Sequence, residues 1–181
     1  MTEKIIEGIK YLLEEETLTA EVIKNQNGYR GNIIIPETIV FNEVTYRVTS
    51  VGKQAFGNCF SLTSVVIPNS VTSIGRDAFW GCDSLKSIVI GNGVTSIGTA
   101  AFMECDSLKS IVIPNSVISI EDSAFKACVS LKSIVIPESV TSIGEEVFWG
   151  CDSLTSIIVA EGNTMYDSRN QCNAIIETAT N

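Results

Sequence analysis

Apolar positions recur with a period of 23 residues through the middle of the chain. The segment SLKSIVI occurs three times and VTSIG three times, at matching places in successive units. The leucine column comprises Leu62, Leu85, Leu108, Leu131 and Leu154, and the phenylalanine column comprises Phe56, Phe79, Phe102, Phe125 and Phe148. Because so short a unit cannot bury its own apolar face, the pattern predicts stacked units in which each column forms a ladder.

Each unit divides into segments with different structural preferences. The alternating, β-branched SIVI predicts a strand with isoleucines inward and residues such as Val89 outward. Proline then ends the strand, SVTSI predicts a second short extended segment, and Gly75 predicts a bend with positive φ. The spacing of alanine, phenylalanine and cysteine predicts a short helix or 3₁₀ turn. We therefore expect an α/β, β-rich fold: a right-handed leucine-rich-repeat solenoid of 23-residue coils with an N-terminal β cap.

The flanks of the array do not follow the repeat. We divide one structural domain into a capping segment (1–44), repeats (45–160) and a C-terminal spacer or cap (161–181). Strands are expected at 9–13, 19–23 and 32–35. The acidic run Glu14, Glu15 and Glu16 is interpreted as a solvated outer face of the cap, with an acidic docking site as the alternative.

Composition excludes several classes of function. The net charge of −9, from 21 acidic and 12 basic residues, argues against binding to nucleic acid. No apolar run is long enough for a membrane span, and the N-terminus lacks the apolar region of a signal peptide. With no histidine, the chain cannot form a Ser-His-Asp or Cys-His nucleophile or a histidine metal site. We therefore expect no enzyme, no catalytic residues and no cofactor.

Five cysteines form a further column of the repeat. They are Cys59, Cys82, Cys105, Cys128 and Cys151. In-register side chains about 4.8 Å apart do not suit a disulfide, whose Cβ atoms lie about 3.8 Å apart. Zinc sites usually need closely spaced cysteine pairs, which are absent. The favoured interpretation is a buried ladder of free thiols, with a disulfide or a metal site as alternatives. Cys172 lies outside the register, and its role stays open.

The outward positions of the predicted strands form the candidate binding face, on the expected concave side. Its apolar stripe comprises Val66, Val89, Val112, Val135 and Ile158. Beside the stripe lie Ser87, Ser110 and Ser133, and the lysine ladder Lys86, Lys109 and Lys132. Repeat proteins commonly bind partners on such an extended surface. The alternative is that these valines only satisfy strand propensity.

Two smaller sets of residues have structural interpretations. Trp80 and Trp149 are expected to pack against the next coil, with an exposed aromatic anchor as the alternative. Asp83, Asp106 and Asp152 are expected to cap turns and to offset the lysine ladder.

The repeat resembles a known family. The segment IPNSVTSIGRDAFWGCDSLKSI (67–88) and its copies are similar to the BspA-type, or Treponema pallidum-type, leucine-rich repeat of bacterial surface proteins, and the resemblance covers about 31–160. YDSRNQCNAIIETATN (166–181) resembles a spacer after which more repeats usually follow. Gly91 replaces the usual proline and Glu121 the usual bend glycine, so looser coils are expected there.

The resemblance implies display on the cell surface and adhesion to host matrix or to other bacteria. We expect a non-enzymatic recognition module that binds a protein or a glycan. The alternative is a structural spacer or assembly segment of a longer array. Free cysteines favour a reducing, cytoplasmic compartment instead, and the partner and oligomeric state stay open.

Overall fold

A computed structural model describes residues 1–168 and 175–178. The strands in these residues are β1 (Thr2–Ile6), β2 (Ile9–Glu14), β3 (Thr19–Val22), β4 (Gly31–Ile34), β5 (Thr38–Phe41), β6 (Val44–Val51), β7 (Leu62–Val66), β8 (Ser73–Ile74), β9 (Ser87–Val89), β10 (Ser96–Ile97), β11 (Ser119–Ile120), β12 (Ser133–Ile136), β13 (Ser142–Ile143), β14 (Ser156–Val159), β15 (Tyr166–Asp167) and β16 (Ile176–Glu177). No α-helix occurs among the described residues, and helical geometry of the 3₁₀ type is confined to Thr178. The fold is therefore mostly β, and the α component of the predicted class is wrong.

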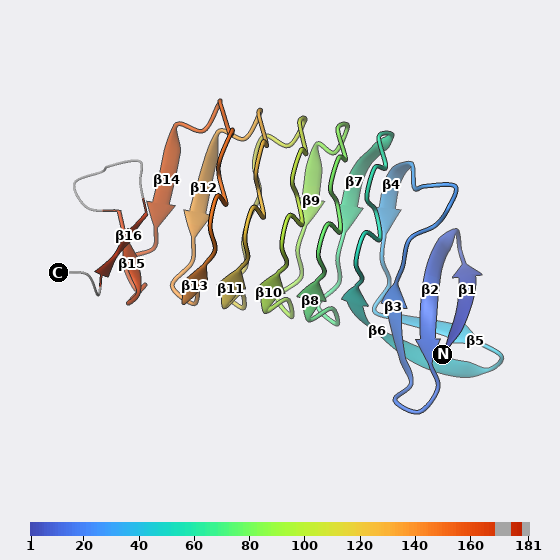
Figure 1. Cartoon of the computed structure of the whole chain (residues 1–181). Coiled ribbons are helices and arrows are strands. Elements are labelled where there is room, and N and C mark those ends of the chain that lie inside the picture. Colours follow the sequence, from blue (N-terminus) through green and yellow to red (C-terminus); the bar gives the residue numbers. More distant parts are fainter. Residues whose placement is uncertain (169–174, 179–181) are drawn as a thin grey trace.

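Successive repeats pair in parallel through their short VTSIG strands. β6, β8, β10, β11 and β13 follow one another in a single sheet, which continues through β3, β2 and β1 of the cap. Ser73 pairs with Ser96 and Ser96 with Ser119, so each residue meets its equivalent in the next repeat. Figure 1 shows the repeats side by side from the cap towards β14. We use the word coil for one such repeat.

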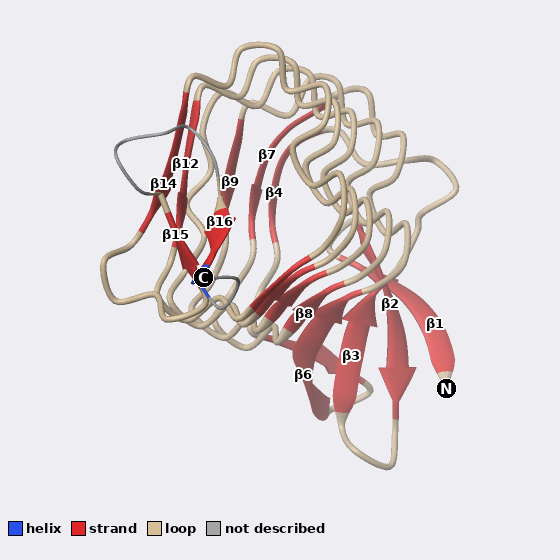
Figure 2. Cartoon of the chain, turned by 60° about the vertical axis from the view of Figure 1, so that its left-hand side comes forward, coloured by secondary structure: helices blue, strands red, loops and turns tan. Residues whose placement is uncertain are grey.

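The longer strands form a second side of the coils. Here β4, β7 and β9 make one parallel sheet and β12 and β14 another. The segment between them, predicted as a strand at 110–113, makes only a parallel bridge from Ser110 to Ser133. In Figure 2 these strands lie on one side of the coils, β8 lies on another, and loops complete the outline.

The third side consists of turns where a short helix was expected. Two residues in each coil have positive φ, such as Gln54 (55°) and Asn58 (62°) in the first. Alternate N–H groups point to the following coil: Phe56 donates to Ala78 O at 2.7 Å and Phe79 to Ala101 O at 2.7 Å. A helix satisfies its N–H groups within one segment, whereas these turns hydrogen-bond neighbouring coils. The prediction of a helix or 3₁₀ turn is therefore wrong.

The phenylalanine column forms a continuous stack through the core. Successive ring centroids from Phe56 to Phe148 lie 4.9, 5.1, 5.3 and 5.8 Å apart, and the ring planes differ by at most 9°. The leucines from Leu62 to Leu131 are fully buried in the same core, and Leu154 is partly buried and packs against this core. Ladders of identical side chains therefore build one core from coils that have no core alone.

The bend glycines serve close packing and not positive φ. Gly75, Gly98 and Gly144 are absent from the positive-φ residues. A Cβ on Gly75 would come within 2.9 Å of the backbone at Gly52, and one on Gly98 within 2.8 Å of Ile74 O. The prediction of positive φ at these positions is therefore wrong. Glycine is needed there because the neighbouring coil comes too close for a Cβ atom.

The two departures from the repeat do not loosen the contacts that they make. A Cβ on Gly91 would lie 2.5 Å from the Pro68 carbonyl, so this coil lies close against its neighbour. The Glu121 carboxylate accepts hydrogen bonds from the backbone N–H and the hydroxyl of Thr99, at 3.0 and 2.8 Å. Both positions therefore connect adjacent coils.

Non-repeating segments cover parts of both ends. At the N-terminal end, Tyr11, Leu13 and Ile39 of the cap are buried with the core. At the other end, the Asn163 side chain donates to Pro137 O and Val140 O, both at 2.9 Å. The hydroxyl of Tyr166 accepts from the Ile143 N–H at 3.0 Å, which satisfies a donor on the edge strand β13.

Candidate functional site

The outward side chains of the longer strands form a row of exposed apolar groups. Val89 is 58% exposed and Val112 79%, while Val66, Val135 and Ile158 are between 36% and 51% exposed. The neighbouring isoleucines, such as Ile88 and Ile134, are buried, as the alternation along a strand requires. This surface, with the serines and lysines beside it, is called the strand face.

One member of the row was missed in the sequence. Ile34 on β4 pairs with Val66 and is 71% exposed. The row therefore has five steps of about 4.8 Å, or roughly 24 Å in all. Ile34 lies outside the 23-residue register, since a register shift separates Gly31 from Asn32. The available signal was the predicted strand at 32–35, in which Ile33 and Ile35 on one face leave Ile34 on the other.

Lysines border the row without ionic partners. Lys86, Lys109 and Lys132 are exposed, as are Ser87, Ser110 and Ser133. In the described part of the chain, none of the ion pairs involves these lysines. A cavity of about 350 Å³ spans three successive coils and is lined by Lys86, Ser107, Lys109 and Ser130. The strand face is thus positive and apolar on a chain of net charge −9.

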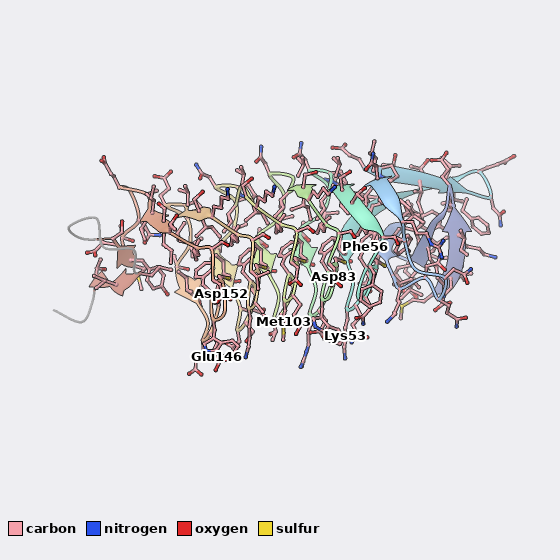
Figure 3. All side chains as sticks on the ribbon, turned by 90° about the horizontal axis from the view of Figure 1, so that it is seen from above. Lys53, Phe56, Asp83, Met103, Glu146 and Asp152 are labelled. Carbon is pink, nitrogen blue, oxygen red and sulfur yellow. The ribbon has the colours of Figure 1, made fainter. Side chains whose placement is uncertain are left out.

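The aspartates that follow the cysteines do not offset these lysines. Asp83, Asp106 and Asp152 are exposed, and none forms an ion pair with a lysine among the described residues. Partial burial and the nearby charges of Asp83 and Glu104 raise the pKa of Asp106. The aspartates therefore form a negative row of their own. Figure 3 labels Asp83 and Asp152 at the two ends of this row.

The two tryptophans have different environments. Trp80 packs towards the next coil, where its indole N–H donates to the Glu104 carboxylate at 3.0 Å. Trp149 is 64% exposed, and Lys126 Nζ lies 4.7 Å from its ring centroid. Lys126 also pairs with Glu146 at 2.6 Å. The prediction of packing against the next coil therefore fits Trp80 and not Trp149.

The cysteine column is a ladder of buried free thiols, as the favoured interpretation predicted. Each thiol from Cys82 onward donates to the carbonyl of the phenylalanine in the preceding coil, for example Cys82 to Phe56 O at 3.1 Å. Burial raises the pKa of Cys82 to about 12 and that of Cys105 well above its usual value. Thiols held neutral in this way are poor nucleophiles. Cys172 lies outside the described residues.

Two further kinds of feature, a metal site and a membrane-spanning helix, are absent from the described residues. Among residues 1–168 and 175–178, no group of three or more cysteine, aspartate or glutamate side chains is placed to hold a metal ion. None of the described segments forms a helix long and apolar enough to cross a bilayer.

Three solved structures resemble the chain closely enough to inform its fold. A leucine-rich repeat protein from Bacteroides ovatus shares 36% identity with a TM-score of 0.76, covering 87% of this chain and 40% of that one. The T. pallidum leucine-rich repeat protein TpLRR shares 32% identity with a TM-score of 0.76, covering 86% and 71%. A leucine-rich cell surface protein from Faecalibacterium prausnitzii shares 26% identity with a TM-score of 0.50, covering 98% and 58%. This chain thus spans less than half the length of the B. ovatus protein.

The sequence of the repeats agrees with these structures. The model of the BspA type leucine-rich repeat region matches residues 47–174 with six copies. No curated protein is significantly similar to the chain. Leucine-rich-repeat proteins of this kind are typically non-catalytic. The match covers more than half of the chain, which therefore belongs to the BspA-type leucine-rich-repeat family.

Proposed function

We propose that the chain is a non-enzymatic recognition module that binds a protein partner through the strand face. The observation that carries the proposal is the row of exposed apolar side chains beside lysines without ionic partners. An exposed apolar patch of this length is typical of an interaction site, and unpaired cations favour an acidic partner. Residues 45–160 would form a right-handed solenoid with this face on its concave side, capped by 1–44 and followed by the spacer 161–181.

The same proposal places the module at the cell surface as an adhesin. Its support is the F. prausnitzii relative, which is described as a leucine-rich cell surface protein. Host matrix proteins and components of other bacteria are the partner classes to test, with surface glycans as a further class.

The test is a triple substitution on the row, Val89→Glu, Val112→Glu and Val135→Glu. Binding to immobilised host matrix proteins and to whole bacterial cells should be abolished, because three carboxylates cannot be buried against an acidic partner. The matched control, Thr72→Glu, Thr95→Glu and Ile118→Glu, adds the same charge at exposed positions on another side of the coils. Far-UV circular dichroism should be unchanged in both variants. Binding by the row variant equal to wild type would place the site elsewhere.

A structural spacer or assembly segment is the second candidate. The N–H groups of Phe125 and Ala127 donate to the following coil, at 3.0 and 2.7 Å. Their equivalents at Phe148 and Gly150 have no acceptor among the described residues. Such donors would suit a further coil or the end of another molecule. A clean monomer in sedimentation velocity at high concentration would count against assembly.

A further inference from the structure

A cavity separate from the strand face lies at the junction between the cap and the first coil. A cavity of about 340 Å³ opens where segment 24–30 meets the turn 57–61. A hydrogen bond of 2.8 Å from the Gly31 N–H to Ser61 O joins the two segments. The volume lies near the lower end of the range of small-molecule pockets, about 300–1,000 Å³, and suits one small ring. We call this cavity the cap pocket.

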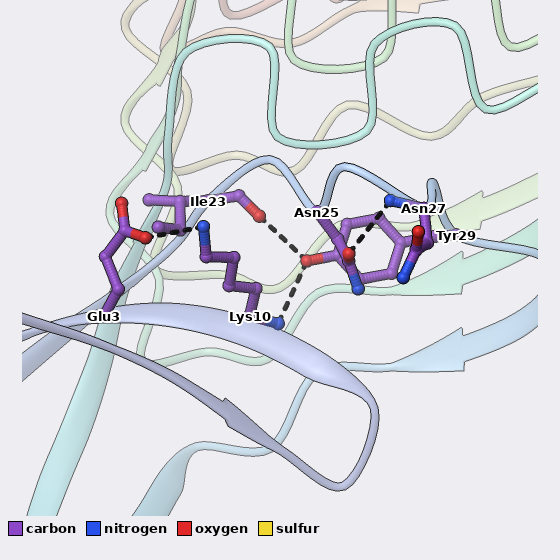
Figure 4. A network of polar contacts seen from close by, with 6 residues as sticks. All are labelled: Glu3, Lys10, Ile23, Asn25, Asn27 and Tyr29. Atoms are coloured by element: carbon purple, nitrogen blue, oxygen red, sulfur yellow. Dashed lines mark hydrogen bonds and ion pairs between the residues drawn. The ribbon is translucent and has the colours of Figure 1, made fainter.

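Hydrogen bonds fix one wall of the cap pocket. The buried hydroxyl of Tyr29 donates to Ile23 O at 2.8 Å and accepts from the Lys10 N–H at 3.0 Å. Asn25 Oδ1 accepts from the Asn27 N–H at 3.1 Å, which holds the loop between them in a turn. Figure 4 shows these contacts. Because the wall is ordered by its own bonds, a ligand would not have to order it.

The floor of the pocket is anchored to the core. The Tyr29 ring lies 4.6 Å from that of Phe56, the first ring of the phenylalanine stack. The Tyr29 N–H donates to the sulfur of Cys59 at 3.2 Å. The pocket is therefore built directly against the buried core of the first coil.

Charge distinguishes the cap pocket from the rest of the molecule. Its lining includes Lys24 and Arg30 and no carboxylate, on a chain with 21 acidic residues. In the described residues neither cation has an ion-pair partner. The position after the cysteine is aspartate in three coils but Phe60 here. The pocket therefore favours an anionic group.

The remaining lining combines an exposed ring with amides. Phe60 is 58% exposed and offers a flat apolar face. Asn25, Gln26, Asn27 and Asn58 supply amide groups, each with donors and an acceptor. A ligand that pairs with the two cations, hydrogen-bonds to the amides and packs on the Phe60 ring carries a carboxylate, several hydroxyls and an apolar ring face.

We propose that the cap pocket binds a single carboxylate-bearing sugar residue. Arg30 and Lys24 pair with its carboxylate, since charge-assisted hydrogen bonds to an anion are the strongest available. The asparagine amides bond to its hydroxyls, and Phe60 covers the apolar face of the ring. This site shares no residue with the strand face, so it is independent of the proposed function.

The experiment is ligand-observed NMR and calorimetry on the whole chain with sodium glucuronate as the probe. Glucose serves as a control that has the sugar ring without the carboxylate, and acetate as a control that has the carboxylate without the sugar ring. Glucuronate should bind in the millimolar range or tighter, and glucose and acetate each at least about tenfold more weakly.

Two exposed residues provide the variants. Arg30→Gln and Phe60→Ala should each weaken binding of glucuronate about tenfold. Matched controls are Arg47→Gln, an exposed arginine on β6, and Val129→Ala, in the same repeat column as Phe60. Both controls should bind like wild type.

Three results would overturn the proposal. They are no binding of glucuronate at millimolar concentration, equal binding of acetate, or unchanged affinity in both Arg30→Gln and Phe60→Ala. None of these results bears on the strand face, whose test uses different substitutions.

Discussion

Replacing Phe102 by alanine removes the central ring of the phenylalanine stack. Phe102 has no exposed surface, and its ring lies 5.1 Å from Phe79 and 5.3 Å from Phe125, nearly parallel to both. Truncating a buried phenylalanine costs about 3–5 kcal/mol, and each aromatic contact contributes about 0.5–1.5 kcal/mol beyond burial. Because the truncation value already includes the contacts that the ring loses, two aromatic neighbours place the expected fall in the free energy of unfolding in the upper part of that range, at about 4–5 kcal/mol.

Phe148 provides a matched control in the same column. It is half-buried, and one ring of the stack neighbours it, that of Phe125 at 5.8 Å. Phe148→Ala should therefore lower the free energy of unfolding by only about 1–2 kcal/mol.

Urea unfolding followed by circular dichroism and by tryptophan fluorescence measures both changes. Coincident transitions would justify a two-state free energy, which repeat proteins do not always permit. A loss at Phe102 no larger than that at Phe148 would refute the reasoning, because position in the stack would then not matter.

Three further predictions concern other columns. Leu108→Ala should lower the free energy of unfolding by about 2–5 kcal/mol in urea, as a fully buried truncation, and a loss below about 1 kcal/mol would contradict the register. Gly98→Ala should lower it by about 1–3 kcal/mol, since the new Cβ would meet Ile74 O at 2.8 Å, and an unchanged midpoint would show that the coils can separate. Because burial raises the pKa of Cys82 to about 12, the unfolded chain ionises first, and stability should fall as pH rises from about 9 to about 12. A Cys82→Ala variant should lose less stability over that range, measured by urea midpoints.

Side-chain ladders were predictable because the 23-residue period is written in the sequence itself. Residues separated by one repeat occupy equivalent places in adjacent coils, so Leu85 stacks with Leu108 whatever the detailed backbone. The outward direction of Val89 and the burial of Cys105 follow from the same register. The role of these outward residues in binding remains a proposal.

Backbone conformation was less accessible to sequence reasoning. The spacing of alanine, phenylalanine and cysteine in AFWGC suits one helical turn, yet Asp77 and Gly81 have positive φ. The alternative turn is stabilised by bonds such as that from the Phe79 N–H to Ala101 O, across 22 residues. Local propensity does not include such partners.

The two candidate sites also differ in how far the sequence alone reveals them. The lysine ladder is visible in the sequence, whereas its lack of ionic partners depends on where Asp83 and Asp106 lie after folding. The cap pocket joins Arg30 to Phe60, which belong to different segments with no shared pattern.

By itself, the sequence determined the period, the columns and the inward or outward direction of most side chains, because stacking repeats a local rule. Only the tertiary structure decided the turns, the close approach at Gly98 and the cavity beneath the cap. Each of these depends on hydrogen bonds or contacts with a neighbouring coil, and such energies exist only once the coils have stacked.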